Sequence, residues 1–166
     1  MKAILERRSV RKYTDQPVSE QDIKDLLTAA MAAPSAGNAR PWHFIVINDR
    51  QTLEEVPKFH QHATTLKQAP VAILVCADQS LEKFKGYWVQ DCAAATENIL
   101  IAATAKDLGT VWMGIYPTDE YIMKIQELLK IPENITPFSL VAVGHAAEDK
   151  EPPIRYDQSR VHHNQW

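Results

Sequence analysis

VAILVC, residues 71–76, is apolar at every position and rich in β-branched side chains. A short run of this kind is typical of a central strand in a sheet that is covered on both faces. Upstream, HFIVIN at residues 43–48 is a second run of strand length with β-branched residues. We therefore expect a sheet that contains both runs, with 71–76 in its interior.

Helical patterns alternate with these strand patterns along the chain. Ser19 and Asp22 resemble a capping box, and apolar residues recur after them at helical spacing until Pro34. Thr118 is a candidate N-cap of another amphipathic helix. The apolar stripe of that second helix consists of Ile122, Ile125, Leu128 and Leu129.

A long helix is predicted over residues 87–108, with Gly109 as its end. Its many Ala and Ile residues surround more than one face, so we expect it to be deeply buried. It is either an internal core helix of one chain or a helix that a second chain covers. Further strands are expected at 110–116 and 140–143.

Composition indicates a folded protein without a global charge signal. The 166 residues are 45% hydrophobic and 23% charged, and the net charge is only -3. This balance argues against nucleic-acid binding and against binding to an anionic membrane surface. No repeat or Gly/Ser-rich linker divides the sequence, so we expect one domain over residues 1–166.

The cysteines and the N-terminus favour a cytoplasmic location. Cys76 and Cys92 both lie in apolar stretches and form no C-x-x-C pair, so buried, reduced thiols are expected. The first residues, MKAILERRSVRK, become charged too early for the apolar core of a secretory signal. No stretch approaches the roughly 20 apolar residues of a membrane span.

Three arginines, Arg7, Arg8 and Arg11, surround Ser9 within five residues. Guanidinium groups form forked hydrogen bonds to phosphate oxygens and the hydroxyl adds one more, so RRSVR is a candidate grip for a phosphate monoester. A solvated basic turn is the alternative interpretation. A nucleic-acid contact through residues 7–12 would require strongly salt-dependent binding, and the acidic net charge disfavours it.

The loop APSAGNARPW, residues 33–42, has an unusual composition for a helix-to-strand connection. Ser35, Ala36 and Gly37 have little bulk, so a flat ligand could approach their backbone closely, and Asn38 offers a donor and an acceptor. These features suit the edge of a heteroaromatic ring. The alternative is an ordinary loop rich in turn-forming residues.

Together these segments resemble the nitroreductase family. RRSVRKY is followed by APSAGNARPWHF, then by WMGIYP at residues 112–117, and finally by VHHNQW at the end of the chain. The resemblance covers essentially the whole sequence. It implies an α+β fold with a central mixed or antiparallel sheet flanked by helices and a long buried helix at a two-fold dimer interface.

The resemblance also implies bound FMN and a set of contacts to it. Arg7, Arg8, Ser9 and Arg11 would hold the phosphate and ribityl chain, with Arg155 of the tail as a further phosphate contact and Arg160 as its competitor for that role. Pro34, Ser35, Ala36 and Asn38 would come from the other subunit and line the flavin ring. Gly114 would let the backbone pass close to the ring, although a simple strand glycine is the alternative.

The resemblance makes the active unit a homodimer with shared sites. The tail, about residues 147–166, lacks periodicity but ends in aromatic and cationic residues, so we expect it to dock on a partner chain. Asn38 and Arg40 are candidates to stabilise negative charge on reduced flavin. Relatives often have Gln at the position of Arg40, so the extra cation either raises the flavin potential or faces solvent.

The implied activity is NAD(P)H oxidation by a ping-pong mechanism, with nitroaromatics, quinones or similar small molecules as acceptors. NADH or NADPH would bind transiently, because the sequence has no G-x-G-x-x-G fingerprint after a strand. We expect no side-chain acid or base and no metal, since neither His60 with His62 nor His162 with His163 has an established ligand spacing around it. The alternative is a non-catalytic flavin-binding protein for storage or sensing on the same fold.

Overall fold

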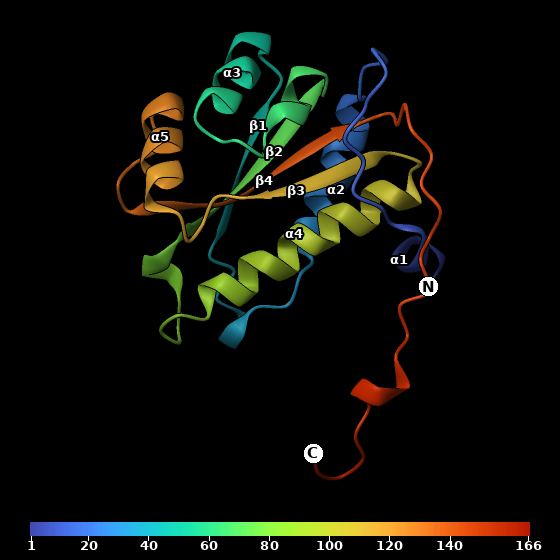
Figure 1. The fold of residues 1–166 in the computed structure, drawn as a ribbon. Coiled ribbons are helices and arrows are strands. Elements are labelled where there is room, and N and C mark those ends of the chain that lie inside the picture. The colour runs from blue at the N-terminus through green and yellow to red at the C-terminus, as the bar shows by residue number, and fades with distance from the viewer.

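The computed structural model describes every residue from 1 to 166 and places a four-stranded sheet between two layers of helices (Figure 1). The strands are β1 (Trp42–Ile47), β2 (Val71–Asp78), β3 (Gly109–Gly114) and β4 (Ile135–Gly144), in the spatial order β1-β2-β4-β3. All neighbouring strands are antiparallel. The expected α+β fold is confirmed, with the antiparallel form of the sheet.

Five α-helices pack on the two faces of this sheet. They are α1 (Lys2–Glu6), α2 (Glu20–Met31), α3 (Arg50–Glu55), α4 (Trp88–Ala105) and α5 (Asp119–Leu129). Helices α2 and α4 cover one face, and α3 and α5 lie against the other (Figure 1). The short α1 contacts α4.

Strand β2 has its two faces buried in two different hydrophobic clusters. Ile73 and Val75 belong to the cluster under α2 and α4, whereas Leu74 and Cys76 belong to the cluster under α3 and α5. This alternation is what the period-2 geometry of a strand dictates for a run without polar residues. The prediction of a central strand covered on both faces is confirmed.

Helix α2 begins as its sequence predicts, because the hydroxyl of Ser19 accepts a hydrogen bond from the backbone N–H of Asp22 at 3.0 Å. Thr118 precedes α5 as expected, but its side chain makes no capping hydrogen bond. The residue at the end of α5, Lys130, has the left-handed conformation.

Helix α4 is shorter than predicted and does not end at a glycine. It stops at Ala105, and Asp107 supplies the left-handed turn with φ of 57°. Gly109 instead begins β3, where an added Cβ would lie 2.8 Å from a methyl carbon of Val10. Packing against α2 and the sheet of the same chain already buries eight of the residues of α4, so the internal-core interpretation accounts for that burial. Its place at a two-fold interface stays a prediction.

The N-terminal segment and the start of the tail run alongside each other at the β3 side of the sheet. Ser9 forms a parallel bridge with Thr110, and Tyr13 forms an antiparallel bridge with Ala146. Residues 151–166 are exposed throughout and extend away from the body of the molecule (Figure 1). None of the helices combines the length and hydrophobicity that crossing a bilayer requires.

Both cysteines are buried and unpaired, as predicted. Burial raises the pKa of the Cys76 thiol and of the Cys92 thiol to about 12. The thiolate is the reactive form of cysteine, so neither side chain is a nucleophile at neutral pH.

Candidate functional site

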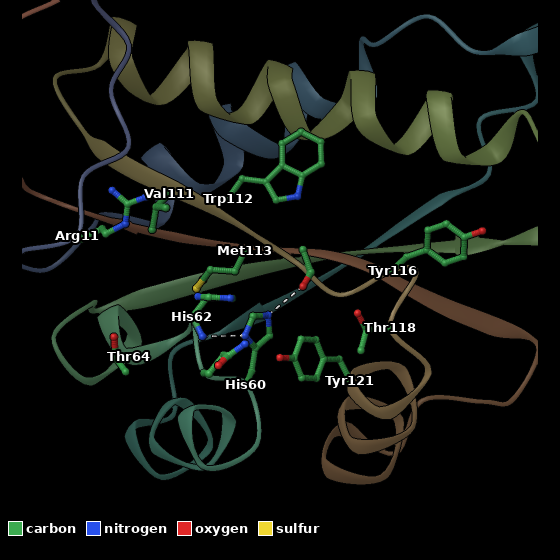
Figure 2. Close-up of a pocket in the computed structure, with 12 residues that line it drawn as sticks. Arg11, His60, His62, Thr64, Val111, Trp112, Met113, Tyr116, Thr118 and Tyr121 are labelled. Atoms are coloured by element: carbon green, nitrogen blue, oxygen red, sulfur yellow. Dashed lines mark hydrogen bonds between the residues drawn. The ribbon is translucent and has the colours of Figure 1, made fainter.

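A cavity of about 700 Å³ lies at the outer edge of β3, between the N-terminal segment and the layer that contains α3 and α5. Figure 2 shows Arg11 at one end of it and Tyr116 at the other. The lining residues are Arg11, His60, Gln61, His62, Thr64, Val111, Trp112, Met113, Gly114, Tyr116, Thr118 and Tyr121. They include one permanent cation and no carboxylate, so the cavity suits a ligand with negative charge.

The backbone at Arg11 is fixed on both sides. Its N–H donates to a carboxylate oxygen of Glu148 at 2.7 Å, and its carbonyl accepts from the hydroxyl of Thr65 at 3.0 Å. Lys150 pairs with Glu148 at 2.9 Å and also donates to the carbonyl of Ser9 at 2.6 Å. These bonds lower the pKa of Glu148, first through Lys150 and then through the Arg11 amide. The arginine-rich segment is therefore anchored before any ligand binds.

The outer edge of β3 presents backbone groups to this cavity. At one end the carbonyl of Thr110 accepts from the N–H of Val10 at 2.8 Å, and at the other the carbonyl of Gly114 contacts His60. Backbone groups alternate in direction along an antiparallel strand, so the N–H and C=O of Trp112 and the N–H of Gly114 point to the same edge. This edge offers donors and an acceptor to a planar ligand.

Gly114 is exposed, and an added Cβ would meet only the carbonyl oxygen of Tyr116, at 3.9 Å. The chain itself therefore gives no steric reason for a glycine at this position. A ligand that lies against the backbone would give one. This favours the ligand-contact interpretation over a simple strand glycine.

His60 is a cavity residue that the sequence did not single out as a cofactor contact. Its side chain is buried, its Nε2 lies 2.9 Å from the Gly114 carbonyl, and its ring stacks on Tyr121 with centroids 4.2 Å apart (Figure 2). The backbone N–H of His62 approaches Nδ1 at 3.3 Å, so the ring is neutral with its proton on Nε2. Burial, partly offset by the Gly114 bond, lowers the pKa of His60. The only sequence signal was the pair of histidines at 60 and 62.

Arg7 and Arg8 do not line this cavity. Arg7 forms an ion pair with Glu97 of α4 at 3.4 Å. The guanidinium of Arg8 donates to backbone carbonyls, including that of Glu151 at 3.0 Å. Its pKa is lowered by partial desolvation and then by the positive charges of Arg155 and Arg7. Three cations thus lie close enough to repel one another, an arrangement that an anion would stabilise.

The two tail arginines differ in their surroundings. Arg155 lies close enough to Arg8 for its charge to act on it, whereas Arg160 forms an ion pair with Asp157 at 3.1 Å. Both lie in the exposed tail. The effect of its charge on Arg8 favours Arg155 as the phosphate contact of the tail, and that role stays a prediction.

The small-residue loop lies on another part of the surface. Pro34, Ser35 and Ala36 line a separate groove of about 380 Å³ together with residues of the loop before α4 and of its first turns. The Ser35 hydroxyl accepts from the N–H of Arg40 at 3.0 Å, and Asn38 and Arg40 both have left-handed backbones, with φ of 56° and 51°. The loop therefore has a defined shape.

Asp91 of α4 anchors this loop and is a second residue that the sequence did not reveal. Its Oδ1 accepts from the N–H of Ala36 at 2.9 Å, and its side chain is buried. Oδ2 has no hydrogen-bond partner within the chain. Nothing in the run WVQDCAAA distinguishes this aspartate from an exposed one, because the contact spans 55 positions.

Within one chain the structure thus brings Arg11 and Gly114 to a common cavity. Ser9 lies next to it, paired with Thr110. Pro34, Ser35, Ala36 and Asn38 do not line the cavity. This separation fits a site that the loop of a second subunit completes, and that arrangement stays a prediction.

Comparison with known proteins gives one consistent result. The sequence profile of the nitroreductase family matches residues 4–64 and 56–145. A protein from Methanothermobacter thermautotrophicus, provisionally named NADH dehydrogenase/NAD(P)H nitroreductase, is 47% identical over 100% of this chain and 87% of its own length. The crystal structure of a provisionally named NADH oxidase from Clostridium acetobutylicum has 41% identity and a TM-score of 0.96, with 99% of each chain covered. A provisionally named nitroreductase from Desulfovibrio desulfuricans, solved in complex with FMN, has 30% identity and a TM-score of 0.85 over 99% of this chain and 96% of its own.

Proposed function

Because the chain belongs to the nitroreductase family, we propose that it binds FMN in the cavity at the outer edge of β3. The observation that carries this proposal is the common cavity of Arg11 and Gly114, a cation for the phosphate and ribityl side and an uncovered backbone for the ring. On these grounds the chain is an FMN-dependent NAD(P)H oxidoreductase.

The residues in and around the cavity fit FMN. Ser9 and Arg11, with the cluster of Arg7, Arg8 and Arg155, supply positive charge and hydrogen-bond donors for a phosphate. The β3 edge supplies the N–H groups of Trp112 and Gly114 for the polar side of the ring. Arg7 and Arg8 now donate to Glu97 and to backbone carbonyls, and neither lines the cavity itself.

When bound, FMN supplies the redox chemistry, which we propose to be hydride acceptance from NADH or NADPH and delivery to a nitroaromatic, quinone or similar acceptor in two alternating half-reactions. The protein provides position and electrostatics. The N–H groups of Trp112 and Gly114 at the β3 edge favour the negative charge that develops on a reduced ring, because this backbone is fixed before reaction. No side chain of the cavity is assigned as acid or base.

We further propose a homodimer with two shared sites. The loop residues Pro34, Ser35, Ala36 and Asn38 of one chain would cover the ring bound by the other. The exposed tail supports this, because Ile154, Tyr156 and Trp166 contact little of their own chain. An obligate interface of this kind buries about 2,000–5,000 Å² in total. The single domain over residues 1–166 would then be active only as a pair.

The proposal is tested by mixing the purified yellow protein with NADH or NADPH without oxygen. Rapid loss of the flavin absorbance with either nucleotide, followed by its return on addition of a quinone, is the expected result. Persistent colour with both nucleotides would instead indicate a storage or sensing protein. Protein that is colourless and takes up no FMN from solution would contradict the cofactor assignment itself.

A further inference from the structure

One backbone group of the cavity wall, the carbonyl at the Gly114 end of β3, is bound by a side chain, whereas the other edge of the strand pairs with β4. β3 ends at Gly114, and beyond Trp112 its outer edge has no strand beside it. The Gly114 carbonyl is instead held by Nε2 of His60 at 2.9 Å. His60 comes from the segment between α3 and β2, so the bond joins two parts of the cavity that are 54 positions apart.

His60 is itself fixed on its two other sides. Its ring lies nearly parallel to that of Tyr121 on α5, with an interplanar angle of 17°. Its Nδ1 faces the backbone N–H of His62. With 1% of its surface exposed, the imidazole has little freedom to turn, so the neutral ring restrains the Gly114 carbonyl in addition to the pairing of β3 with β4.

We propose that His60 is a positioning residue for the flavin ring: its neutral imidazole holds the Gly114 end of β3, the backbone against which the ring binds. This inference rests on the proposed function. It adds that ring binding weakens on acidification for a reason independent of the phosphate.

The effect of acid follows from the hydrogen bonds. A second proton would have to sit on Nδ1, where it would face the N–H of His62, so two donors would oppose each other. The titratable and charged groups around the ring are His62, Tyr121 and, elsewhere in the cavity, Arg11 and Tyr116. None is a carboxylate that could stabilise an imidazolium. Protonation therefore removes the hydrogen bond from His62, one of the contacts that hold the ring against Gly114.

The test measures dissociation constants for riboflavin and FMN by fluorescence quenching between pH 8 and pH 5. Riboflavin has no phosphate, so it reports on the ring alone. Wild-type protein should bind riboflavin more weakly at pH 5 than at pH 8, by up to about tenfold as the His60 ring becomes protonated. The expected size corresponds to the loss of about one hydrogen bond, since 1.4 kcal/mol is a factor of ten.

Two substitutions separate positioning from simple folding. His60→Gln keeps an N–H donor for Gly114 but does not titrate, so it should bind riboflavin within about threefold of wild type at pH 8 and show no loss at pH 5. His60→Leu should bind about tenfold more weakly at both pH values. His43→Gln, at an exposed histidine of β1 outside the cavity, should keep the wild-type pH profile.

The outcomes distinguish the proposed function from the positioning role of His60. If wild-type protein binds neither flavin at pH 8, the proposed function fails. If it binds FMN but riboflavin affinity is the same at pH 5 and pH 8, or if His60→Leu matches wild type with either flavin, the positioning role of His60 is refuted. Arg11→Ala is the contrasting variant, because it should weaken FMN binding far more than riboflavin binding. Should His60→Leu fail to fold, the pH profiles of wild type and His60→Gln decide the question.

Discussion

Gly109 and Gly114 stand at the two ends of β3 and are glycines for different reasons. At Gly109 the side chain of Val10 occupies the space where a Cβ would lie, with atoms at 2.8 and 2.9 Å. At Gly114 the nearest atom is 3.9 Å away and belongs to the backbone just after the strand. The fold therefore explains the first glycine, and a bound ligand would explain the second.

This contrast predicts opposite phenotypes for two alanine substitutions. Gly109→Ala should lower the free energy of unfolding by about 1–3 kcal/mol, because the N-terminal segment must move. Gly114→Ala should change it by less than about 1 kcal/mol but weaken FMN binding about tenfold or more. Urea unfolding of the flavin-free proteins and FMN titration check both. Unchanged FMN affinity in Gly114→Ala would show that the flavin does not require a glycine at this position.

His60 makes a pH-dependent contribution to stability whose sign can be stated. Its folded pKa is lowered from the ordinary value of about 6.5, so between these two values the unfolded chain binds more protons than the folded one. Stability from the neutral ring is thus complete above pH 6.5 and falls as the pH drops toward the folded pKa. His60→Gln should abolish this part of the pH dependence.

The measurement compares wild-type and His60→Gln proteins without flavin in urea at pH 7.5, 6.5 and 5.5. The difference in unfolding free energy should move in favour of the variant as the pH falls. Most carboxylates stay ionised over this range, so they contribute little to the change. A difference that is constant across the three pH values would show that His60 does not titrate as described.

At the scale of elements, the spacing of apolar residues predicted most of the helices and strands, because that spacing follows directly from which face of an element is buried. β2 is buried on both faces, and its apolar sequence shows this directly. α2 carries its own cap at Ser19. The end of α4 was predicted wrongly, because glycine is the usual left-handed residue and in this chain Asp107 has that conformation. The sequence could not show that Gly109 serves close packing against Val10.

The candidate site was only partly predictable, because some of its residues act through contacts with distant parts of the sequence. Arg11 and Gly114 belong to recognisable motifs, and the structure brings them to one cavity. His60 and Asp91 act through contacts over 54 and 55 positions, which no local pattern encodes. The partners of Arg7 and Arg8, which are Glu97 and the Glu151 carbonyl, are even more distant in sequence. The sequence showed the charges of Arg7 and Arg8, but it did not show which groups they bind.

Asp91 of α4 attaches the small-residue loop to the helix. Asp91→Ala removes the acceptor for the Ala36 N–H, so this amide should exchange with solvent about tenfold to a hundredfold faster, as expected for the loss of about 1–3 kcal/mol. Asp91→Asn keeps an oxygen acceptor and should retain most of the protection. Hydrogen exchange of the peptide that covers residues 33–42 is the measurement. Equal exchange in wild type and Asp91→Ala would mean that another contact holds the loop.

At the scale of the whole molecule, one chain leaves several large apolar side chains exposed. Trp166 is fully exposed at the end of a tail whose residues 151–166 are all exposed, and Phe84 and Tyr87 are exposed near the groove of the small-residue loop. Light scattering should therefore report about twice the 18.8 kDa of one chain. A stable monomer that retains FMN would contradict the shared site.

The central claim is that one chain provides Arg11 and the β3 edge for a flavin, while its partner provides the small-residue loop. Arg11→Ala damages the Arg11 side of a site, and Asp91→Ala damages the small-residue loop. A dimer with one chain of each kind therefore has one intact site and one site with both defects. The decisive measurement is the number of FMN molecules bound per heterodimer, purified with two different affinity tags. It is made at an FMN concentration that leaves both mutant homodimers nearly empty. We predict one FMN per heterodimer, whereas a heterodimer as empty as the two homodimers would show that each site is built from a single chain.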